Sequence, residues 1–304
     1  MNALEQLSES TAAAVQLAAQ GIVRVEGRRR LPSSGLLWSD GDLVVTAHHT
    51  IERRSDVRVG LPGGETLEAK VLGRDPATDL AVLRLPRLSG KPLALADPTQ
   101  IRVGHLALAV GRPGESAQAT MGIISAIDGG WRTPFGGHLD AFIQSDVVMY
   151  PGFSGGALID AWGRLVGMNT SGVLRGVSLA VPTVAIARIA KTLVEHGRVR
   201  RGYLGVGVQP ARLAKPHGAS AQATGLLVAS VEEGSPAEKG GLFLGDVLLT
   251  MGGKPLASMD DLLAALGGDV VGQSASVEVM RGGKTSTIQV TIGERPAPVE
   301  EEEE

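Results

Sequence analysis

The sequence predicts a mainly β protein in which two small β-barrels precede a smaller β-rich module. Between residues 21 and 197, short runs rich in Val, Leu and Ile alternate with Gly, Pro and Asp, a spacing typical of barrels and sandwiches. The end of this region, residues 184–196, has apolar residues at helical spacing and stops at Gly197, a common helix terminator. Residues 202–293 return to the strand pattern and predict a separate unit.

Length and composition narrow the classes of protein to consider. The chain has 304 residues, of which 43% are hydrophobic and 20% charged, so it is long enough for two globular domains. A net charge of −3 gives no reason to expect nucleic acid or a membrane as a partner, and 3% aromatic residues argue against a base-stacking surface. The absence of cysteine excludes disulfides, thiol catalysis and thiolate metal sites. We expect no metal ion or other cofactor.

Residues 1–20 predict a weakly amphipathic N-terminal helix. Its apolar positions at helical spacing are Leu4, Leu7, Val15 and Ala18. This segment lacks a positively charged start and carries Glu5 and Glu9, so it does not read as a signal peptide. As written, the sequence predicts a cytoplasmic protein; if its N-terminus was trimmed, we expect a periplasmic or other extracytoplasmic one.

The C-terminal third consists of a linker, a second unit and a tail. Residues 198–201 are a basic stretch that we interpret as a solvated linker. Within the unit at 202–293, a helix is expected just after Ser258, a candidate N-cap. Residues 294–304 are rich in Pro and Glu and predict a disordered acidic tail.

One glycine-rich segment, residues 152–156 (GFSGG), predicts a site of chemistry. Glycines on both sides of Ser154 permit a tight turn that exposes the hydroxyl and directs backbone N–H groups at a substrate carbonyl. The other interpretation is an ordinary hairpin turn, in which Gly and Ser are common. A nucleophilic serine needs a base, and the base needs a carboxylate to orient it.

Candidates for both groups occur upstream. His48 and His49 follow an apolar strand, and because neighbouring side chains on a strand face opposite ways, only one of them can point into a given cleft. Asp79 lies at the edge of another apolar strand, where a half-buried carboxylate needs a donor such as an imidazole N–H.

Several strings in this order resemble the chymotrypsin-like proteases and, more closely, the HtrA (Deg) family of serine proteases with PDZ domains. They are VVTAHH (44–49), DPATDLAVL (75–83), GFSGGALID (152–160), GRLVGMNT (163–170), SLAVP (178–182) and RGYLGV (201–206). The resemblance implies a chymotrypsin-like double β-barrel at residues 21–197 and a PDZ domain at residues 202–293. It also implies a homo-oligomer, commonly a trimer.

The resemblance also assigns roles to residues. It implies that His49 is the general base and acid, that Asp79 fixes its tautomer, and that Ser154 attacks the scissile carbonyl. The N–H groups of Gly152 and Ser154 are then expected to form the oxyanion hole. The resemblance thus implies a serine endopeptidase that degrades unfolded or damaged proteins through an acyl-enzyme.

Substrate contacts are expected at two places. Val148, Met149, Thr170 and Ser171 are expected to line the primary specificity pocket, and because no acidic residue is among them, we expect cleavage after small or medium apolar residues. In the PDZ domain, the loop at Tyr203, Leu204, Gly205 and Val206 is expected to capture a C-terminal carboxylate, with the peptide adding as an extra strand.

One departure from the family pattern leaves alternatives open. Phe153 stands where the family usually has Asn, and we expect it to alter substrate fit or the resting shape of the nucleophile loop. The chain could therefore act as a peptide-binding sensor or chaperone with little proteolysis. GFSGG also satisfies the nucleophile-elbow pattern of α/β-hydrolases, which would require alternating helices and strands and a histidine downstream of Ser154.

Overall fold

The structure is a computed structural model that describes residues 2–29, 31–52, 57–132, 138–139, 141–174, 176–217, 222–267 and 270–296. The chain divides into two compact units, residues 1–199 and 200–304. Most of the expected acidic tail, residues 297–304, lies outside the described residues. No helix within the described ranges is long and apolar enough to cross a membrane.

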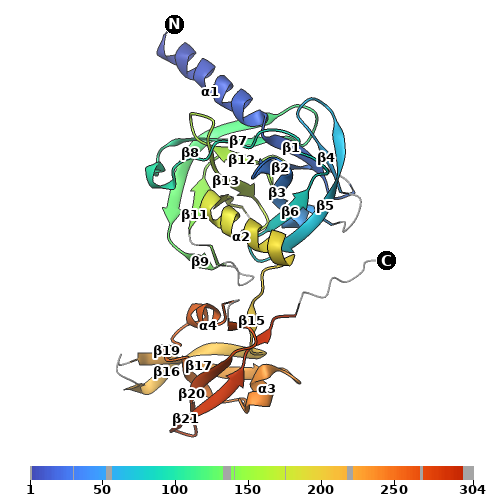
Figure 1. Cartoon of the computed structure of the whole chain (residues 1–304). Helices are drawn as coiled ribbons and strands as arrows, with labels where there is room; N and C mark the ends of the chain where they lie inside the picture. The colour runs from blue at the N-terminus through green and yellow to red at the C-terminus, as the bar shows by residue number, and fades with distance from the viewer. Residues whose placement is uncertain are drawn as a thin grey trace. The chain divides into compact units, whose positions relative to one another are not determined.

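Helix α1 (Ala3–Ala19) opens the first unit and projects from the barrels (Figure 1). Asn2 caps it, because its side chain accepts from the N–H of Glu5 while the Glu5 carboxylate accepts from the N–H of Asn2, both at 2.9 Å. Ala18 in the last turn is buried, whereas Leu4 is 78% exposed. The amphipathic pattern therefore buries only the end of the helix that touches the barrels.

The first barrel is a closed antiparallel sheet in the order β1-β2-β3-β6-β5-β4. Its strands are β1 (Ile22–Glu26), β2 (Ser33–Trp38), β3 (Leu43–Ala47), β4 (Val57–Gly60), β5 (Thr66–Asp75) and β6 (Leu80–Arg84). Val23, Val44 and Leu83 are among the side chains that fill its interior. A short 3-10 turn, η1 (His48–Thr50), follows β3 directly.

The second barrel is also closed, in the order β11-β14-β13-β12-β7-β8. Its strands are β7 (Leu106–Gly111), β8 (Gln118–Asp128), β11 (Phe142–Ser145), β12 (Ala157–Ile159), β13 (Leu165–Thr170) and β14 (Ser178–Pro182). Outside the barrel are η2 (Pro98–Gln100) and the pair β9 (Trp131–Arg132) and β10 (His138–Leu139). Two closed barrels confirm the fold class expected from the sequence, and they exclude the alternating pattern of an α/β-hydrolase.

Helix α2 (Thr183–His196) closes the first unit, as its apolar spacing predicts. Ile186, Ile189 and Leu193 are buried in a cluster that also contains residues of both barrels. Gly197 ends the helix with φ +73°, a left-handed conformation that glycine adopts without strain. The helix therefore holds the two barrels against each other.

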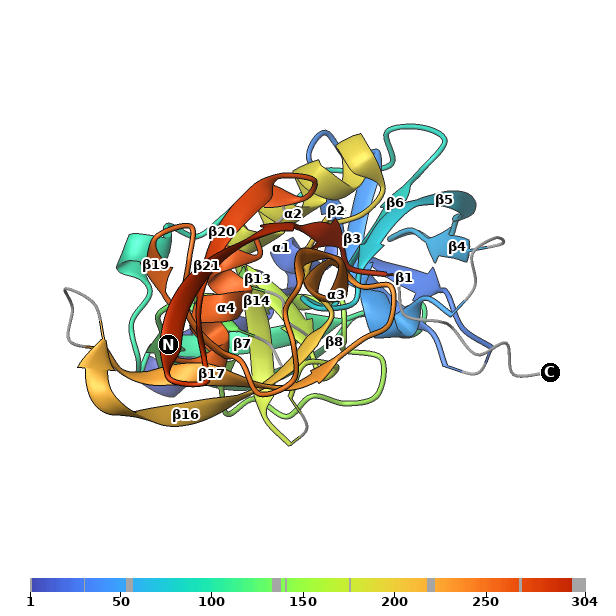
Figure 2. The same ribbon diagram turned by 90° about the horizontal axis from the view of Figure 1, so that it is seen from below.

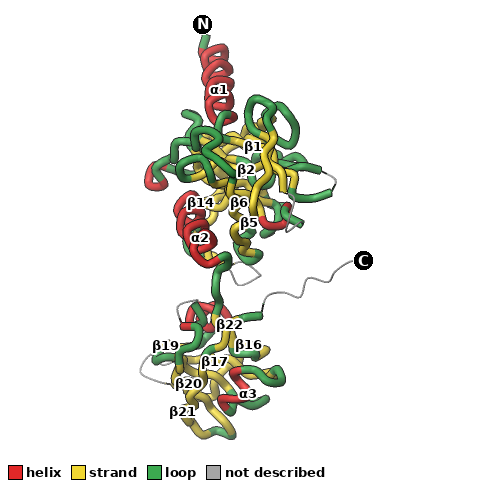
Figure 3. The backbone as a smooth tube through the Cα atoms, turned by 45° about the vertical axis from the view of Figure 1, so that its right-hand side comes forward, coloured by secondary structure: helices red, strands yellow, loops and turns green. Residues whose placement is uncertain are grey.

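The second unit is built on a sheet in the order β16-β17-β18-β20-β21, and Figure 3 shows strands predominating here as in the first unit. Its elements are β15 (Gly202–Tyr203), β16 (Val206–His217), β17 (Gln222–Val231), α3 (Pro236–Gly240), β18 (Val247–Met251), β19 (Lys254–Pro255), α4 (Met259–Ala265), β20 (Ser274–Arg281), β21 (Lys284–Thr291) and β22 (Gly293–Glu294). Ser258 caps α4, as expected. The pairing order leaves β16 at an edge of the sheet (Figure 2).

Candidate active site

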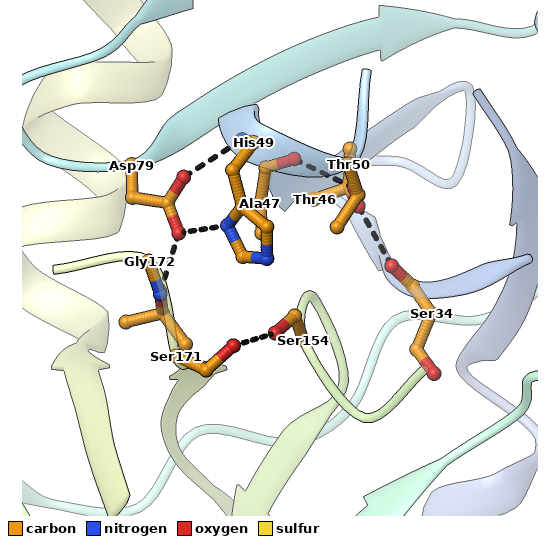
Figure 4. Close-up of polar contacts among 10 residues, drawn as sticks. Ser34, Thr46, Ala47, His49, Thr50, Asp79, Ser154, Ser171 and Gly172 are labelled. Carbon is orange, nitrogen blue, oxygen red and sulfur yellow. Dashed lines mark hydrogen bonds and ion pairs between the residues drawn. The ribbon is translucent and has the colours of Figure 1, made fainter. Parts of the chain in front are cut away.

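The first barrel supplies a histidine held by a carboxylate (Figure 4). His49 lies in η1, where the chain turns at the end of β3. Its backbone N–H donates to Asp79 Oδ1 at 2.8 Å, and its Nδ1 lies 2.8 Å from Asp79 Oδ2. The His49 side chain is 31% exposed and that of Asp79 only 4%, so a buried carboxylate orients an imidazole that reaches solvent.

Asp79 occupies an unusual backbone position, the turn that leads into β6. Its φ is +56°, in the left-handed region, where Asp is one of the more tolerated residues. Its carbonyl accepts from the N–H of His48 at 3.0 Å, which fixes the turn against η1. A third donor reaches the carboxylate, the hydroxyl of Thr170 on Oδ2.

Thr170 and Gly172 complete this arrangement from the second barrel. The N–H of Gly172 donates to Thr170 Oγ1 at 3.0 Å, which directs the threonine proton towards Asp79. A Cβ at position 172 would lie 2.5 Å from His49 Nδ1 and 2.7 Å from Asp79 Oδ2, so only glycine fits there. The sequence carries no signal for the Thr170–Asp79 contact, because the two residues are 91 positions apart.

Ser154 follows a tight turn at residues 150–153. The N–H of Phe153 donates to the carbonyl of Tyr150 at 3.0 Å, and Gly152 has φ +90°. Proline followed by a residue with positive φ is the pattern of a type II turn, which requires glycine at position 152. Within the part of the chain that the structure describes, the N–H groups of Gly152 and Ser154 have no acceptor.

The first barrel holds this nucleophile loop in place through Ser34 of β2. Ser34 Oγ donates to the carbonyl of Gly152 at 2.7 Å, and its N–H donates to the carbonyl of Ser154 at 3.1 Å. The approach is so close that a Cβ on Gly155 would lie 2.0 Å from the carbonyl oxygen of Ser34. No local pattern in the sequence indicates this role of Ser34, because its contact with Gly152 spans 118 positions.

Phe153, the departure from the family pattern, points into the second barrel. Its side chain is fully buried in the cluster that contains Leu158 and Val166. Its ring meets that of Tyr150 edge to face, with centroids 5.8 Å apart. Phe153 therefore anchors the loop to the barrel and does not line the cleft.

The Ser154 hydroxyl itself faces a second serine. Ser154 Oγ lies 3.0 Å from Ser171 Oγ, and the residue is 8% exposed (Figure 4). No hydrogen bond joins Ser154 to His49 among the described side chains. Catalytic hydrogen bonds are often long or unmade without substrate, so this arrangement is consistent with a resting state.

These residues share one open cleft of about 700 Å³. It is lined by Arg28, Arg29, Leu31, His49, Glu52, Met149, Tyr150, Pro151, Gly152, Ser154 and Ser171. Of the four residues expected in the specificity pocket, Met149 and Ser171 line the cleft. Val148 is 57% exposed and is not among the lining residues, and Thr170 is buried on Asp79.

His48 lies next to His49 but in a different environment. Its Nδ1 is buried and has no partner among the described residues. This burial lowers the pKa of His48 below the ordinary value, although the nearby Asp79 carboxylate opposes the change. Burial thus favours the neutral imidazole at His48, and the imidazole that contacts Asp79 is that of His49.

The loop expected to bind peptide in the second unit lies where β15 gives way to the edge strand β16. Gly205 has φ +77°, and a Cβ there would lie 2.3 Å from Ser235 Cβ. The N–H groups of Leu204 and Gly205 donate to nothing in the described ranges of the chain. The hydroxyl of Tyr203 donates to Glu232, which raises the pKa of that phenol. Backbone amides of this kind, beside an exposed strand edge, can bind the terminal carboxylate of a peptide.

Comparison with known families agrees with this geometry. Residues 33–168 match the family described as trypsin-like peptidase domain, and residues 202–292 match the PDZ domain family. The "probable periplasmic serine endoprotease DegP-like" of Pseudomonas putida is 36% identical over 271 residues, covering 86% of this chain and 56% of the relative. The protein of the same description from Chlamydia trachomatis is 35% identical over 287 residues, covering 90% and 56%. The chain thus spans a little over half the length of these relatives.

Solved structures extend the similarity over nearly the whole chain. The HtrA-type protease AlgW with a decapeptide is similar with a TM-score of 0.77 and 31% identity, covering 95% of this chain and 99% of that one. The serine endoprotease from Yersinia pestis is similar with a TM-score of 0.77 and 29% identity, covering 94% and 98%. Because the chain has the two barrels and the PDZ unit, and because the similarity covers nearly its whole length, it belongs to the HtrA family of serine proteases.

Proposed function

We propose that this chain is a serine endopeptidase in which Ser154 is the nucleophile, His49 the general base and acid, and Asp79 the group that orients His49. One observation carries the proposal. His49 is fixed through Nδ1 on a buried carboxylate and shares a cleft with Ser154, whose turn presents amides that have no acceptor in the described part of the chain. These are the parts that acyl transfer to a serine requires.

In this proposal each group has one task. With its proton on Nδ1 and donated to Asp79, the imidazole keeps a lone pair on Nε2 to accept the proton of Ser154 as Oγ attacks the carbonyl carbon. The N–H groups of Gly152 and Ser154 bind the oxyanion, and such donors are each worth about 3 kcal/mol in the transition state. His49 then protonates the leaving amine, and water hydrolyses the acyl-enzyme by the same steps.

The hydrogen bond between the hydroxyls of Ser154 and Ser171 must be broken before the first of these steps. The Ser154 hydroxyl must rotate about its side-chain bond from Ser171 towards His49. A neutral hydrogen bond contributes only about 1 kcal/mol, so binding of a substrate supplies enough free energy to release it.

Substrate and setting belong to the same proposal. Met149 and Ser171 carry no charge, which supports cleavage after small or medium apolar residues. Unfolded or damaged proteins are the substrates that the family resemblance implies. The named relatives are periplasmic, and we place this chain in the same compartment, assembled as a homotrimer as its family resemblance implies.

Labelling with a fluorophosphonate tests the proposed chemistry directly. The reagent should attach to a single serine, and peptide mapping by mass spectrometry should locate it at Ser154, because only an activated hydroxyl reacts quickly. Heat-unfolded protein is the control and should remain unlabelled. A folded chain that takes up no label would leave a peptide-binding sensor as the better description.

The PDZ unit is proposed to bind peptides by their free C-terminus. The amides of Leu204 and Gly205 have no acceptor among the described residues, and β16 offers a strand edge. Hydrogen bonds to a charged acceptor contribute about 1.5–3 kcal/mol, so converting the peptide's terminal carboxylate to an amide should weaken binding by at least about tenfold.

Fluorescence polarisation measures this difference in the Ser154→Ala chain, which cannot cleave the probes. The paired probes share one apolar sequence and differ only in the terminal carboxylate or amide. Equal affinity for the two would show that the loop at residues 203–206 does not recognise a chain terminus.

A further inference from the structure

The cleft carries a cationic wall that the proposed mechanism does not use. Arg28 and Arg29 line it together with His49 and Ser154, and they come from the segment that joins β1 to β2. Glu52 is the one carboxylate that the described lining contains. The described lining of the cleft therefore contains two arginines and one carboxylate beside the nucleophile.

Unlike four other arginines of the same unit, these two have no acidic partner among the described residues. Arg24 and Arg58 pair with Glu26, Arg87 with Glu65, and Arg164 with Asp160, at 2.6–2.9 Å. No described carboxylate lies within ion-pair distance of Arg28 or Arg29. Arg28 Nε instead donates to the carbonyl of Leu31 at 2.6 Å, which holds its side chain, and its terminal nitrogens have no partner among the described residues.

The cationic wall lies on a definite side of Ser154. The segment that carries it continues to Pro32, whose carbonyl oxygen would lie 2.9 Å from a Cβ on Gly152. Glu52 is tied to the same segment, since its N–H donates to the carbonyl of Gly27 at 2.9 Å. Ser171, by contrast, has its Oγ 3.0 Å from Ser154 Oγ, and the next residue, Gly172, lies beside Asp79.

A bound substrate passes the nucleophile in one direction, so its two halves occupy different sides of the cleft. If the residue before the scissile bond lies against Met149 and Ser171, as the proposed function states, the residues after the bond lie towards Gly152 and the arginines. Planar guanidinium groups bind carboxylates with two parallel hydrogen bonds, and in a partly enclosed cleft such pairs are stronger than in open solvent.

We propose that Arg28 and Arg29 form a subsite for a carboxylate in the first few residues after the scissile bond. The carboxylate comes from an Asp or Glu side chain or from a chain terminus at that distance. The inference rests on the proposed function and deepens it: the enzyme selects apolar residues before the cleaved bond and acidic groups after it.

Internally quenched peptides with one common sequence before the scissile bond test this subsite. Three amidated versions carry Glu, Gln or Lys at the second and third positions after the bond, and a fourth carries Gln at the second position and ends in a free carboxylate at the third. We expect kcat/KM for the Glu peptide to exceed that for the Gln peptide by about tenfold, with Lys lower still. The ratio should shrink in 0.5 M salt, because salt screens exposed charges. The fourth peptide shows whether a terminal carboxylate replaces the side chain.

Variants identify the residues responsible. In Arg28→Gln/Arg29→Gln the Glu-to-Gln ratio should fall to about one, and in Arg28→Glu/Arg29→Glu the Lys peptide should become the preferred one. Arg58→Gln is the matched control, because Arg58 is an exposed arginine of the same barrel that pairs with Glu26, and it should keep the parent's ratio. A ratio near one in the parent, or an unchanged ratio in the double variant, overturns the proposal.

A binding measurement separates this inference from the proposed function. The Ser154→Ala chain should bind the amidated Glu peptide about tenfold more tightly than the Gln peptide, and this readout needs no catalysis. If Ser154 is labelled but the Glu and Gln peptides bind with equal affinity, the proposed peptidase stands and the proposed subsite is wrong. If the protein is not labelled but still binds the Glu peptide more tightly, the carboxylate subsite stands and the proposed peptidase is wrong.

Discussion

Replacing Ser154 with alanine is expected to lower kcat for a peptide substrate by about a millionfold. The change removes the only atom that can form the acyl-enzyme in the proposed mechanism, while the oxyanion donors and the binding cleft remain. Initial rates with an internally quenched apolar peptide measure the loss. Ser154 lies in a turn held by Ser34 and Phe153, so the fold should persist, and an unchanged thermal unfolding midpoint checks this.

Ser171→Ala is the matched control, because the two hydroxyls lie only 3.0 Å apart. This variant loses one hydrogen bond of about 1 kcal/mol, which corresponds to about a fivefold change in rate, in either direction. A loss in Ser171→Ala as large as that in Ser154→Ala would mean that the wrong hydroxyl has been assigned the attack. Full activity in Ser154→Ala would exclude the mechanism altogether.

Asp79→Asn is expected to lower kcat by about ten-thousandfold. Three donors converge on the carboxylate: the N–H of His49, its Nδ1–H and the hydroxyl of Thr170. An asparagine offers one oxygen and directs an NH₂ group at the remaining donors. The imidazole must then accept from that NH₂ at Nδ1 and carry its proton on Nε2, the nitrogen that should receive the proton of Ser154.

The rate of fluorophosphonate labelling should fall along with peptide hydrolysis, because both depend on the lone pair of Nε2. Asp97→Asn provides the control, since Asp97 is an exposed carboxylate that caps η2 through Thr99. It should stay within about twofold of the parent, as expected for a surface substitution. Activity in Asp79→Asn within tenfold of the parent would show that His49 is not oriented by Asp79.

Local patterns in the sequence were enough for the architecture. Short β-branched runs separated by Gly and Pro predict strands because the side-chain period and the turn chemistry are local properties, and two closed barrels confirm that interpretation. The stop of α2 at Gly197 and the cap of α4 at Ser258 follow from residues within one turn of each helix end. The candidate nucleophile was also visible, because a turn with positive φ requires glycine beside it.

The partners that shape the site were not visible, because each lies far away along the chain. Thr170 was expected in a specificity pocket, yet its hydroxyl is bonded to Asp79 on the other barrel. Phe153 was expected to affect substrate fit or the resting shape of the nucleophile loop, and the structure buries its ring among residues of strands β12 and β13. Arg28 and Arg29 were not expected to line the site at all, because nothing in their own segment indicates which loop they meet.

The sequence by itself thus determined the strands, the two units and the residue types available for chemistry, all of which depend on neighbours a few positions apart. Only the tertiary structure decided what each of those residues touches. Ser34 holds the nucleophile loop across 118 positions, and Gly172 leaves room for the His49–Asp79 contact. Such contacts arise when two closed barrels meet, and their geometry depends on the packing of both, which no local pattern encodes.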